Sequence, residues 1–345
     1  MATLSVLSLG VVMELDISVI IPSNNSHQQL FRIVQAVCDQ TVKPTEIVIV
    51  DSSLNDASET PVIVALCKSN NIKLIYEQRE LTMPGRARNI GLDLSSGQLI
   101  AFIDVQTIPR KIWIEASLSL LEGHDVAGVW GATYFNGVTK FEGLMRDGFY
   151  GAHPQRTLPG SIFKRFVFEK TGQFIEWVRA GEDTEWMMRA LVLRLTIVSS
   201  SVILIDYVGL IGLDINQLLK KWHRNYSASR DLPQFFPYKM LLWLVLYPLF
   251  ILIAFNWNHL IADWRIDSPL YIGHVTKLAA ILPALTYTVV RGIFLPLRRG
   301  VDIRNLVPIR FLAIISICLA ADLMRALVYT LPRFKGIAAN AKIIK

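Results

Sequence analysis

Two short stretches of the sequence hold charged and amide side chains at a spacing that could bind a phosphorylated ligand. Residues 84–91 read Pro-Gly-Arg-Ala-Arg-Asn-Ile-Gly, a pattern that predicts a helix carrying Arg88 and Asn89. After a short turn, an apolar run over residues 99–104 predicts a buried strand that ends at Asp104. Ligands of open α/β sheets bind at the carboxyl ends of the strands. The cation, the amide and the carboxylate together indicate a site for a nucleotide-like ligand.

Two further acidic positions extend this candidate site. The apolar run over residues 46–51 predicts another buried strand, which ends in Asp51. Farther along, Glu182 and Asp183 open a predicted helix over residues 182–194. A helix N-terminus favours an ionised carboxylate, so Asp183 could accept a proton. The alternative reading is that Asp51 is a strand-end turn residue and Asp183 an ordinary helix cap.

The segments that must position these residues alternate between strands and helices. Strands are predicted over residues 17–22, 46–51, 73–76, 99–104, 126–133 and 160–163, and helices over residues 28–39, 58–69, 84–95, 111–121, 165–170 and 182–194. Short apolar runs separated by helical patterns are typical of an α/β fold with a doubly wound, mostly parallel sheet. Residues 135–160 are rich in glycine, and we expect irregular substrate loops there.

Charge and hydropathy divide the chain near residue 215. Residues 1–215 carry 18 Lys and Arg against 23 Asp and Glu, whereas residues 216–345 carry 17 against 5. The second part also holds long apolar stretches over residues 240–257, 278–297 and 306–331. Basic residues beside apolar spans favour an anionic membrane surface or a pyrophosphate-bearing lipid as partner, rather than nucleic acid. The three cysteines show no metal-binding spacing and no disulfide framework.

These patterns predict four regions along the chain. They are a cytoplasmic α/β domain over residues 1–215, a basic amphipathic interface segment over 216–239, a membrane domain with two to three transmembrane helices over 240–331, and a basic tail over 332–345. Basic residues before the first span place the α/β domain in the cytoplasm, and those of the loop 298–305 place that loop there too. A third crossing would export the basic tail, so residues 306–331 either form a re-entrant segment or the tail is an exception.

Five short motifs occur in a fixed order along the first part of the chain. They are Pro22-Ser23-Asn24-Asn25, Gln40-Thr41, Val50-Asp51-Ser52-Ser53-Leu54-Asn55-Asp56, Ala87-Arg88-Asn89-Ile90-Gly91 and Gly181-Glu182-Asp183-Thr184-Glu185. Over about residues 16–230, this series resembles the family 2 glycosyltransferases. The resemblance implies a Rossmann-like GT-A domain that uses a nucleotide-diphosphate sugar. The spans that follow also resemble those of polyprenyl-phosphate glycosyltransferases, which implies a multi-pass protein of the plasma (inner) membrane.

The resemblance assigns roles to particular residues. Asp183 corresponds to the catalytic base of an inverting reaction, and Asp51 to the residue that binds the nucleobase. The other positions implied in donor binding are Pro22, Asn25, Arg88, Asn89, Asp104 and Gln106. Possible contacts to the diphosphate or the acceptor are Glu182, Lys220, Lys221 and Arg224.

The metal requirement is in question because of one substitution. Asp104 occupies the first position of the family's Asp-x-Asp motif, which holds the ribose and a divalent metal, but Gln106 replaces the second carboxylate. An amide oxygen is a poorer ligand than a carboxylate for a hard cation. A Mg²⁺ or Mn²⁺ ion at Asp104 is therefore expected to bind weakly, to use another ligand, or to be absent. Basic residues of the segment 216–239 could then stabilise the leaving group, or they only contact lipid head groups.

The predicted function is the inverting transfer of one sugar to a membrane-associated, lipid-linked acceptor in envelope or extracellular polysaccharide synthesis. Residues 217–222 only approximate the Gln-x-x-Arg-Trp motif of processive synthases. The alternative is a non-catalytic protein that binds a nucleotide sugar or scaffolds a membrane glycan assembly, and Gln106 is its main support. A soluble nucleotidyltransferase would leave the apolar spans and the Glu182-Asp183 pair unexplained.

Overall fold

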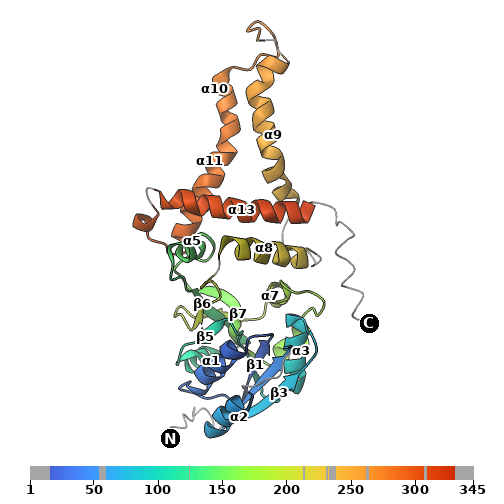
Figure 1. Ribbon diagram of the computed structural model, residues 1–345, viewed down its shortest axis with the longest axis vertical. Helices are drawn as coiled ribbons and strands as arrows, with labels where there is room; N and C mark the ends of the chain where they lie inside the picture. The colour runs from blue at the N-terminus through green and yellow to red at the C-terminus, as the bar shows by residue number, and fades with distance from the viewer. Residues whose placement is uncertain are drawn as a thin grey trace. The chain divides into compact units, whose positions relative to one another are not determined.

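The computed structural model describes residues 16–53, 60–123, 125–212, 214–230, 232, 238–261, 264–306 and 309–330. The chain divides into two compact units, Met1–Leu213 and Asp214–Lys345 (Figure 1). The first unit mixes strands and helices, and the elements described in the second unit are helices.

Parallel strands form the first half of the sheet, as the sequence predicts. The strand order is β3-β2-β1-β4, and each neighbouring pair is parallel. Parallel strands inside a sheet are covered on both faces, which explains the apolar sequences of β1, β2 and β4. The strands are β1 (Ile17–Ser23), β2 (Glu46–Asp51), β3 (Lys73–Gln78) and β4 (Leu99–Phe102), and the helices that follow the first three are α1 (His27–Cys38), α2 (Thr60–Ser69) and α3 (Pro84–Leu94).

The second half of the sheet mixes strand directions. β7 pairs antiparallel with β4 and β6, whereas β8 and β9 run parallel to β6 and β5 pairs antiparallel with β9. The elements are β5 (Thr107–Pro109), α4 (Trp113–Leu121), β6 (Gly128–Phe135), β7 (Gln155–Lys164), α6 (Phe166–Thr171), α7 (Glu182–Val192), β8 (Ile197–Ser199) and β9 (Ile205–Tyr207). The strand expected over residues 160–163 is therefore longer than predicted, and β5, β8 and β9 were not predicted.

Residues 135–160 are more regular than the glycine content suggests. They contain helix α5 (Lys140–Phe149) and the first half of β7, so the prediction of irregular loops is wrong there. A capping box begins the helix: the backbone N–H of Glu142 donates to Thr139 Oγ1 at 3.2 Å, and the N–H of Thr139 donates to Glu142 Oε2 at 3.0 Å. These bonds satisfy backbone donors that a helix N-terminus leaves unpaired.

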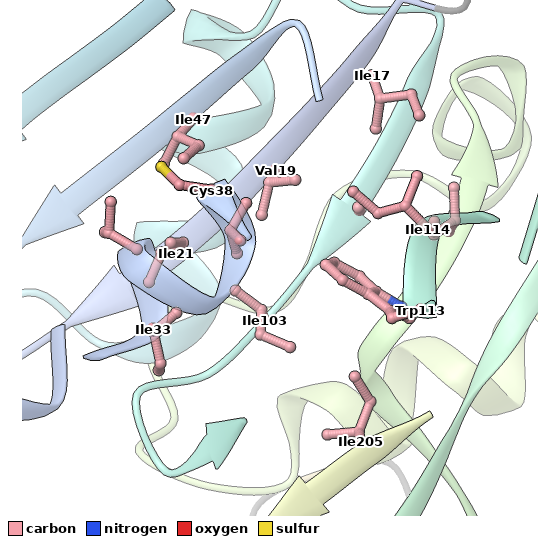
Figure 2. Close-up of a cluster of buried hydrophobic side chains, with 14 of the residues drawn as sticks. Ile17, Val19, Ile21, Ile33, Cys38, Ile47, Ile103, Trp113, Ile114 and Ile205 are labelled. Atoms are coloured by element: carbon pink, nitrogen blue, oxygen red, sulfur yellow. The ribbon is translucent and has the colours of Figure 1, made fainter. Parts of the chain in front are cut away.

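Two apolar clusters, one on each face of the sheet, form the core of the first unit. Successive side chains of a strand point to opposite faces, and accordingly Val19 and Ile21 belong to one cluster and Ile20 to the other. Figure 2 shows the first cluster, in which Trp113 of α4 packs among isoleucines. The Trp113 indole also donates to the carbonyl oxygen of Gly160 at 2.8 Å, so its polar atom is satisfied inside the core.

The second unit holds long apolar helices. His274–Arg298 and Arg310–Tyr329 are long and apolar enough to cross a membrane by length and composition, which suggests that the unit associates with a membrane. The helices are α8 (Ile215–Ser229), α9 (Tyr238–Leu260), α10 (His274–Lys277), α11 (Leu282–Val289), α12 (Leu295–Arg298) and α13 (Arg310–Thr330). The turns η1 (Leu278–Ile281) and η2 (Val290–Phe294) join α10, α11 and α12, and η3 (Ile303–Asn305) follows them.

Candidate active site

Helix α3 carries Arg88 at a position where the helix packs closely against its neighbours. A Cβ atom at Gly91 would clash with Ile20 of β1, and one at Gly85 would clash with the carbonyl oxygen of Ile175. Glycine at these two positions therefore lets α3 approach both the sheet and the segment that leads to α7. Arg88 is only 3% exposed as a result.

The guanidinium of Arg88 joins two carboxylates that are distant in the sequence. Its Nη2 lies 3.0 Å from Asp104 Oδ1, and its Nη1 lies 2.6 Å from Glu182 Oε1. The side chain of Glu182 is buried, whereas that of Asp104 is one-third exposed. Buried charges are stable only when they are paired. The structure thus brings together three of the residues that the sequence singled out.

The burial of this cluster sets its electrostatics. Burial raises the pKa of the Glu182 carboxyl; the Arg88 charge opposes this shift, and the Asp183 charge adds to it. Burial alone would lower the pKa of Arg88, but the charges of Asp104 and Glu182 outweigh it and raise that pKa. Arg88 therefore remains a cation and keeps both carboxylates in place.

The first turn of α7 carries three acidic residues with different surroundings. Glu182 pairs with α3 as described, and Glu185 pairs with Arg189 at 2.7 Å. Asp183 is half-buried; its Oδ1 accepts a hydrogen bond from the Thr184 N–H at 2.7 Å, and it makes no ion pair within the described part of the chain. Because Glu182 and Glu185 are engaged in ion pairs, Asp183 is the first-turn acid best placed to accept a proton.

Asn89 connects α3 to the segment that precedes α7. Its Nδ2 donates to the Phe174 carbonyl oxygen and to Glu176 Oε1, each at 2.9 Å. Its Oδ1 accepts from the Phe174 N–H at 2.9 Å, and the side chain is 2% exposed. These hydrogen bonds hold the segment that precedes α7 against α3. A direct contact between Asn89 and a donor stays a prediction.

Asp51 lies at the carboxyl end of β2, beside Ser23 of β1. It is fully buried, and its carboxylate accepts hydrogen bonds from the Tyr76 hydroxyl and the Ser53 hydroxyl, each at 2.7 Å. Burial and the Asp51 charge raise the pKa of Tyr76, so its hydroxyl keeps its proton and donates. Neither Tyr76 nor Ser53 was predicted as a partner of Asp51, and the expected contact of Asp51 with a nucleobase remains a prediction.

Pro22 and Asn25 lie at the carboxyl end of β1. Pro22 is paired with Val50 of β2. Asn25 has a φ angle of 49°, a left-handed conformation that asparagine adopts more readily than most residues. Its N–H donates to Ser53 Oγ at 2.8 Å, so Ser53 ties the ends of the two strands together. The predicted donor-binding residues of both strands therefore lie at one edge of the sheet.

The residues present do not form a preorganised site for Mg²⁺ or Mn²⁺. The Oε1 of Gln106 accepts a hydrogen bond from the Tyr207 hydroxyl at 2.8 Å, and burial raises the pKa of Tyr207, so that donor persists. One oxygen of Asp104 is held by Arg88. Among the described residues, no group of three or more His, Cys, Asp or Glu side chains could hold a metal ion. A single partly engaged carboxylate is a weak ligand set for a hard divalent cation.

The predicted basic contacts lie on α8, in the second unit. Lys220, Lys221 and Arg224 follow one another along this helix, which begins with a capping box formed by Asp214 and Gln217. Burial lowers the pKa of Lys221, and the neighbouring Arg224 charge lowers it further. Their contact with a leaving diphosphate stays a prediction.

Comparison with known sequences finds a family model that matches most of the first unit. Residues 18–181 match the family model described as Glycosyl transferase family 2. Glycosyltransferase AglE from Haloferax volcanii is 27% identical over 186 residues, which cover 50% of this chain and 60% of AglE. The succinoglycan biosynthesis protein ExoO from Rhizobium meliloti is 28% identical over 163 residues, which cover 46% of this chain and 45% of ExoO. The chain thus spans less than two thirds of either relative.

Comparison with solved structures supports the same fold. The mannosyltransferase PcManGT from Pyrobaculum calidifontis, solved in complex with GDP-Man and Mn²⁺, aligns with a TM-score of 0.51 at 16% identity. The alignment covers 90% of this chain and 86% of PcManGT. At this identity the likeness concerns the fold alone.

Proposed function

We propose that the chain, whose residues 18–181 match the model of family 2 glycosyltransferases and whose fold is similar to that of a solved glycosyltransferase, transfers one sugar from a nucleotide-diphosphate donor to an acceptor held at a membrane. The observation that carries the proposal is the convergence of Arg88, Asp104 and Glu182 beside the half-buried Asp183. Two carboxylates and a proton acceptor at the ligand-binding edge of an α/β sheet suit this chemistry.

The proposed reaction is a direct displacement with inversion. Asp183 accepts the proton of the acceptor hydroxyl while the hydroxyl oxygen attacks the anomeric carbon of the sugar. The new glycosidic C–O bond forms as the C–O bond to the diphosphate breaks, and the nucleoside diphosphate leaves with the bonding electrons. Arg88 does not reach the donor in this scheme, because both of its terminal nitrogens hold carboxylates.

The nucleoside end of the donor is assigned to the carboxyl ends of β1 and β2. Asp51, Ser53 and Asn25 form a hydrogen-bonded group there. The exposed part of Asp104 is assigned to the ribose. PcManGT, which shares the fold, was solved with GDP-Man, and this supports a nucleotide sugar as the donor class.

No step of this scheme passes through a metal ion, because the residues at Asp104 and Gln106 do not assemble a site for one. Negative charge on the departing diphosphate then needs cationic side chains. Lys220, Lys221 and Arg224 of α8 are the candidates for this role.

The proposed acceptor is lipid-linked, and the reaction belongs to envelope or extracellular polysaccharide synthesis. The apolar helices of the second unit support a membrane acceptor, and the names of ExoO and of the amylovoran biosynthesis glycosyltransferase AmsB from Erwinia amylovora support polysaccharide synthesis. The basic residues that precede α9 support a cytoplasmic first unit at the inner membrane.

The test is nucleotide release by the full chain in detergent, with UDP-, dTDP- and GDP-sugars as donors and a membrane-lipid extract as acceptor. We expect turnover of one donor, and we expect Asp183→Asn to lower kcat at least about 100-fold, as loss of a general base does. Glu169→Gln, an exposed acid on α6, is the matched control and should retain full activity. Nucleotide binding without turnover in the wild type would instead support the non-catalytic alternative, which the Gln106–Tyr207 hydrogen bond favours.

A further inference from the structure

We propose that α13 lies flat in the cytoplasmic interface of the membrane beside α8, so that, among the described helices of the second unit, only the hairpin of α9 and α10–α12 crosses the bilayer. The surface formed by α8 and α13 would then bind anionic lipid head groups, and the basic tail would stay on the cytoplasmic side. This inference rests on the membrane association proposed above, but it does not depend on the glycosyl transfer reaction.

The hairpin is held together along its length. Near its middle, the Tyr247 hydroxyl contacts the Ala280 carbonyl oxygen and accepts a hydrogen bond from the Ala284 N–H at 3.3 Å. At its tip, Asn258 donates to the Ile272 carbonyl oxygen at 2.7 Å and accepts from the Ile272 N–H at 2.9 Å. Its exposed apolar side chains include Leu249, Leu252, Leu282, Leu285, Val289 and Phe294. At about 1.5 Å per residue, both arms are long enough for a hydrocarbon core of about 30 Å.

Helix α13 crosses this hairpin and also packs along α8 (Figure 1). At its C-terminal end, the Tyr329 hydroxyl lies 2.9 Å from Ser229 Oγ. One turn earlier, the Arg325 guanidinium lies 4.8 Å from the centre of the Tyr226 ring and donates to the Tyr226 hydroxyl at 3.3 Å. The C-terminal turns of α8 and α13 are therefore neighbours.

These contacts between α8 and α13 limit how deep α13 can lie in the membrane. If α13 crossed the bilayer from Arg310, Arg325 would lie about 22 Å deep at a rise of about 1.5 Å per residue, beyond the middle of the hydrocarbon core. Tyr226 and Ser229 of α8 would have to lie at that depth too. α8 carries several basic residues, and charges at that depth are costly. In the interface, the same contacts keep α8 at the membrane surface.

α13 also contacts the returning arm of the hairpin. Asp322 Oδ2 lies 2.9 Å from Arg291 Nη2 and accepts a hydrogen bond from the Tyr287 hydroxyl at 3.0 Å. Arg291 is about 10 Å from Arg298 along the returning arm, near the point where that arm leaves the membrane. α13 is therefore attached to the part of the hairpin nearest its cytoplasmic end.

The exposed face of α13 is apolar. Leu312, Leu319 and Leu327 are exposed at a spacing that puts them on one face, whereas Ile314 and Cys318 are buried on the other. The leucine face can contact the acyl chains of the membrane.

The charge distribution agrees with this topology. Residues 298–305, at and after the end of α12, carry Arg298, Arg299 and Arg304, and the tail carries Arg333, Lys335, Lys342 and Lys345. With α13 in the interface, the loop and the tail lie on the same side as α8. On the opposite side, the described loop residues 264–273 carry one basic residue, Arg265, which pairs with Asp267 at 2.9 Å. This arrangement satisfies the positive-inside rule, which a third crossing would break.

The first test is labelling of single cysteines with a membrane-impermeant maleimide in vesicles of both orientations. The three native cysteines are buried, so the wild-type chain is the unlabelled control. We expect Ser227→Cys on α8 and Ala339→Cys in the tail to react from the cytoplasmic face, and Ile266→Cys in the hairpin loop to react from the opposite face. Reaction of Ala339→Cys from the same face as Ile266→Cys would overturn the proposal.

The second test measures depth directly. Spin labels on Leu312→Cys and Leu327→Cys in liposomes with anionic lipid should report equal depth by power saturation, whereas a crossing helix would separate them by about 22 Å. Unequal depths would overturn the proposal. Removal of the wild-type protein from membranes by carbonate would overturn the membrane association as well, and an assay of sugar transfer on the released protein would still decide the enzymatic proposal.

Discussion

Arg88 Nη1 lies 2.6 Å from Glu182 Oε1, although 94 positions separate the two residues in the sequence. The pair joins α3 to the first turn of α7, and both side chains are buried. The second terminal nitrogen of Arg88 holds Asp104 at the end of β4. Arg88 is therefore a positioning residue: it fixes the start of α7, and with it Asp183, relative to the carboxyl edge of the sheet.

Breaking this pair from one side should destabilise the first unit strongly. Arg88→Met leaves Glu182 as a buried, uncompensated charge, and we expect a loss of about 3–5 kcal/mol in the free energy of unfolding. The double variant Arg88→Met/Glu182→Leu should recover part of that loss, because it removes both charges. Denaturant unfolding of the full chain in detergent measures both, with the exposed neighbour Arg86→Met as control. Equal stability of Arg88→Met and Arg86→Met would contradict the assignment.

The hydrogen bond from Tyr76 to Asp51 should matter for donor binding. Tyr76→Phe leaves one carboxylate oxygen of a fully buried Asp51 without its donor, and we expect a stability cost of about 1–3 kcal/mol. If Asp51 orients the nucleobase, KM for the donor should rise more than kcat falls. Tyr134→Phe, which removes a hydrogen bond to Arg146 instead, is the matched control and should leave KM unchanged. An unaltered KM in Tyr76→Phe would argue against a role for Asp51 in the nucleoside site.

Some of this arrangement follows from the sequence alone. Buried parallel strands are uninterrupted apolar runs, so β1, β2 and β4 could be predicted, and their order along the chain already brings Arg88 and Asp104 to one edge. The hydrogen-bond partners of the individual site residues could not be predicted. The Tyr207 hydroxyl meets Gln106 across 101 positions, through a pairing of β5 with β9. Strands of three residues are too short for a periodicity to reveal them, and hence this contact was missed.

The same hydrogen bond predicts how a metal site could be introduced. Gln106→Asp adds a second carboxylate near Asp104, and we expect the variant to bind Mn²⁺ about tenfold or more tightly than the wild type, since ligand charge sets the affinity for hard cations. EDTA should then inhibit the variant more than the wild type. Tyr207→Phe is the control: it frees the Gln106 amide without adding charge, and its metal response should change much less. Equal EDTA sensitivity in all three proteins would contradict the expectation.

Glu46 should make the stability of the fold depend on pH in the acidic range. It is fully buried at the start of β2 and accepts hydrogen bonds from the Ser18 hydroxyl at 2.7 Å and from the Lys73 ammonium at 3.1 Å. Burial alone would raise the pKa of Glu46, but these bonds and those from Ser96 lower it from 4.5 to about 2. A depressed pKa means that the folded state favours the ionised carboxylate. The ionised Glu46 therefore contributes about 3 kcal/mol to the free energy of unfolding. This contribution is present above about pH 4.5 and is lost as the pH falls toward 2.

The variant Glu46→Gln tests this directly. It removes the ionisation while keeping the size of the side chain, so the free energy of unfolding at pH 7 should fall by about 2–3 kcal/mol. The difference between wild type and variant should shrink steadily below about pH 4.5, because the wild-type carboxylate becomes protonated as the pH approaches 2. Denaturant unfolding of the full chain at a series of pH values measures both curves. Glu169→Gln, an exposed carboxylate on α6, should follow the wild-type curve throughout. Parallel curves for Glu46→Gln and the wild type across this range would show that Glu46 does not carry the pH dependence.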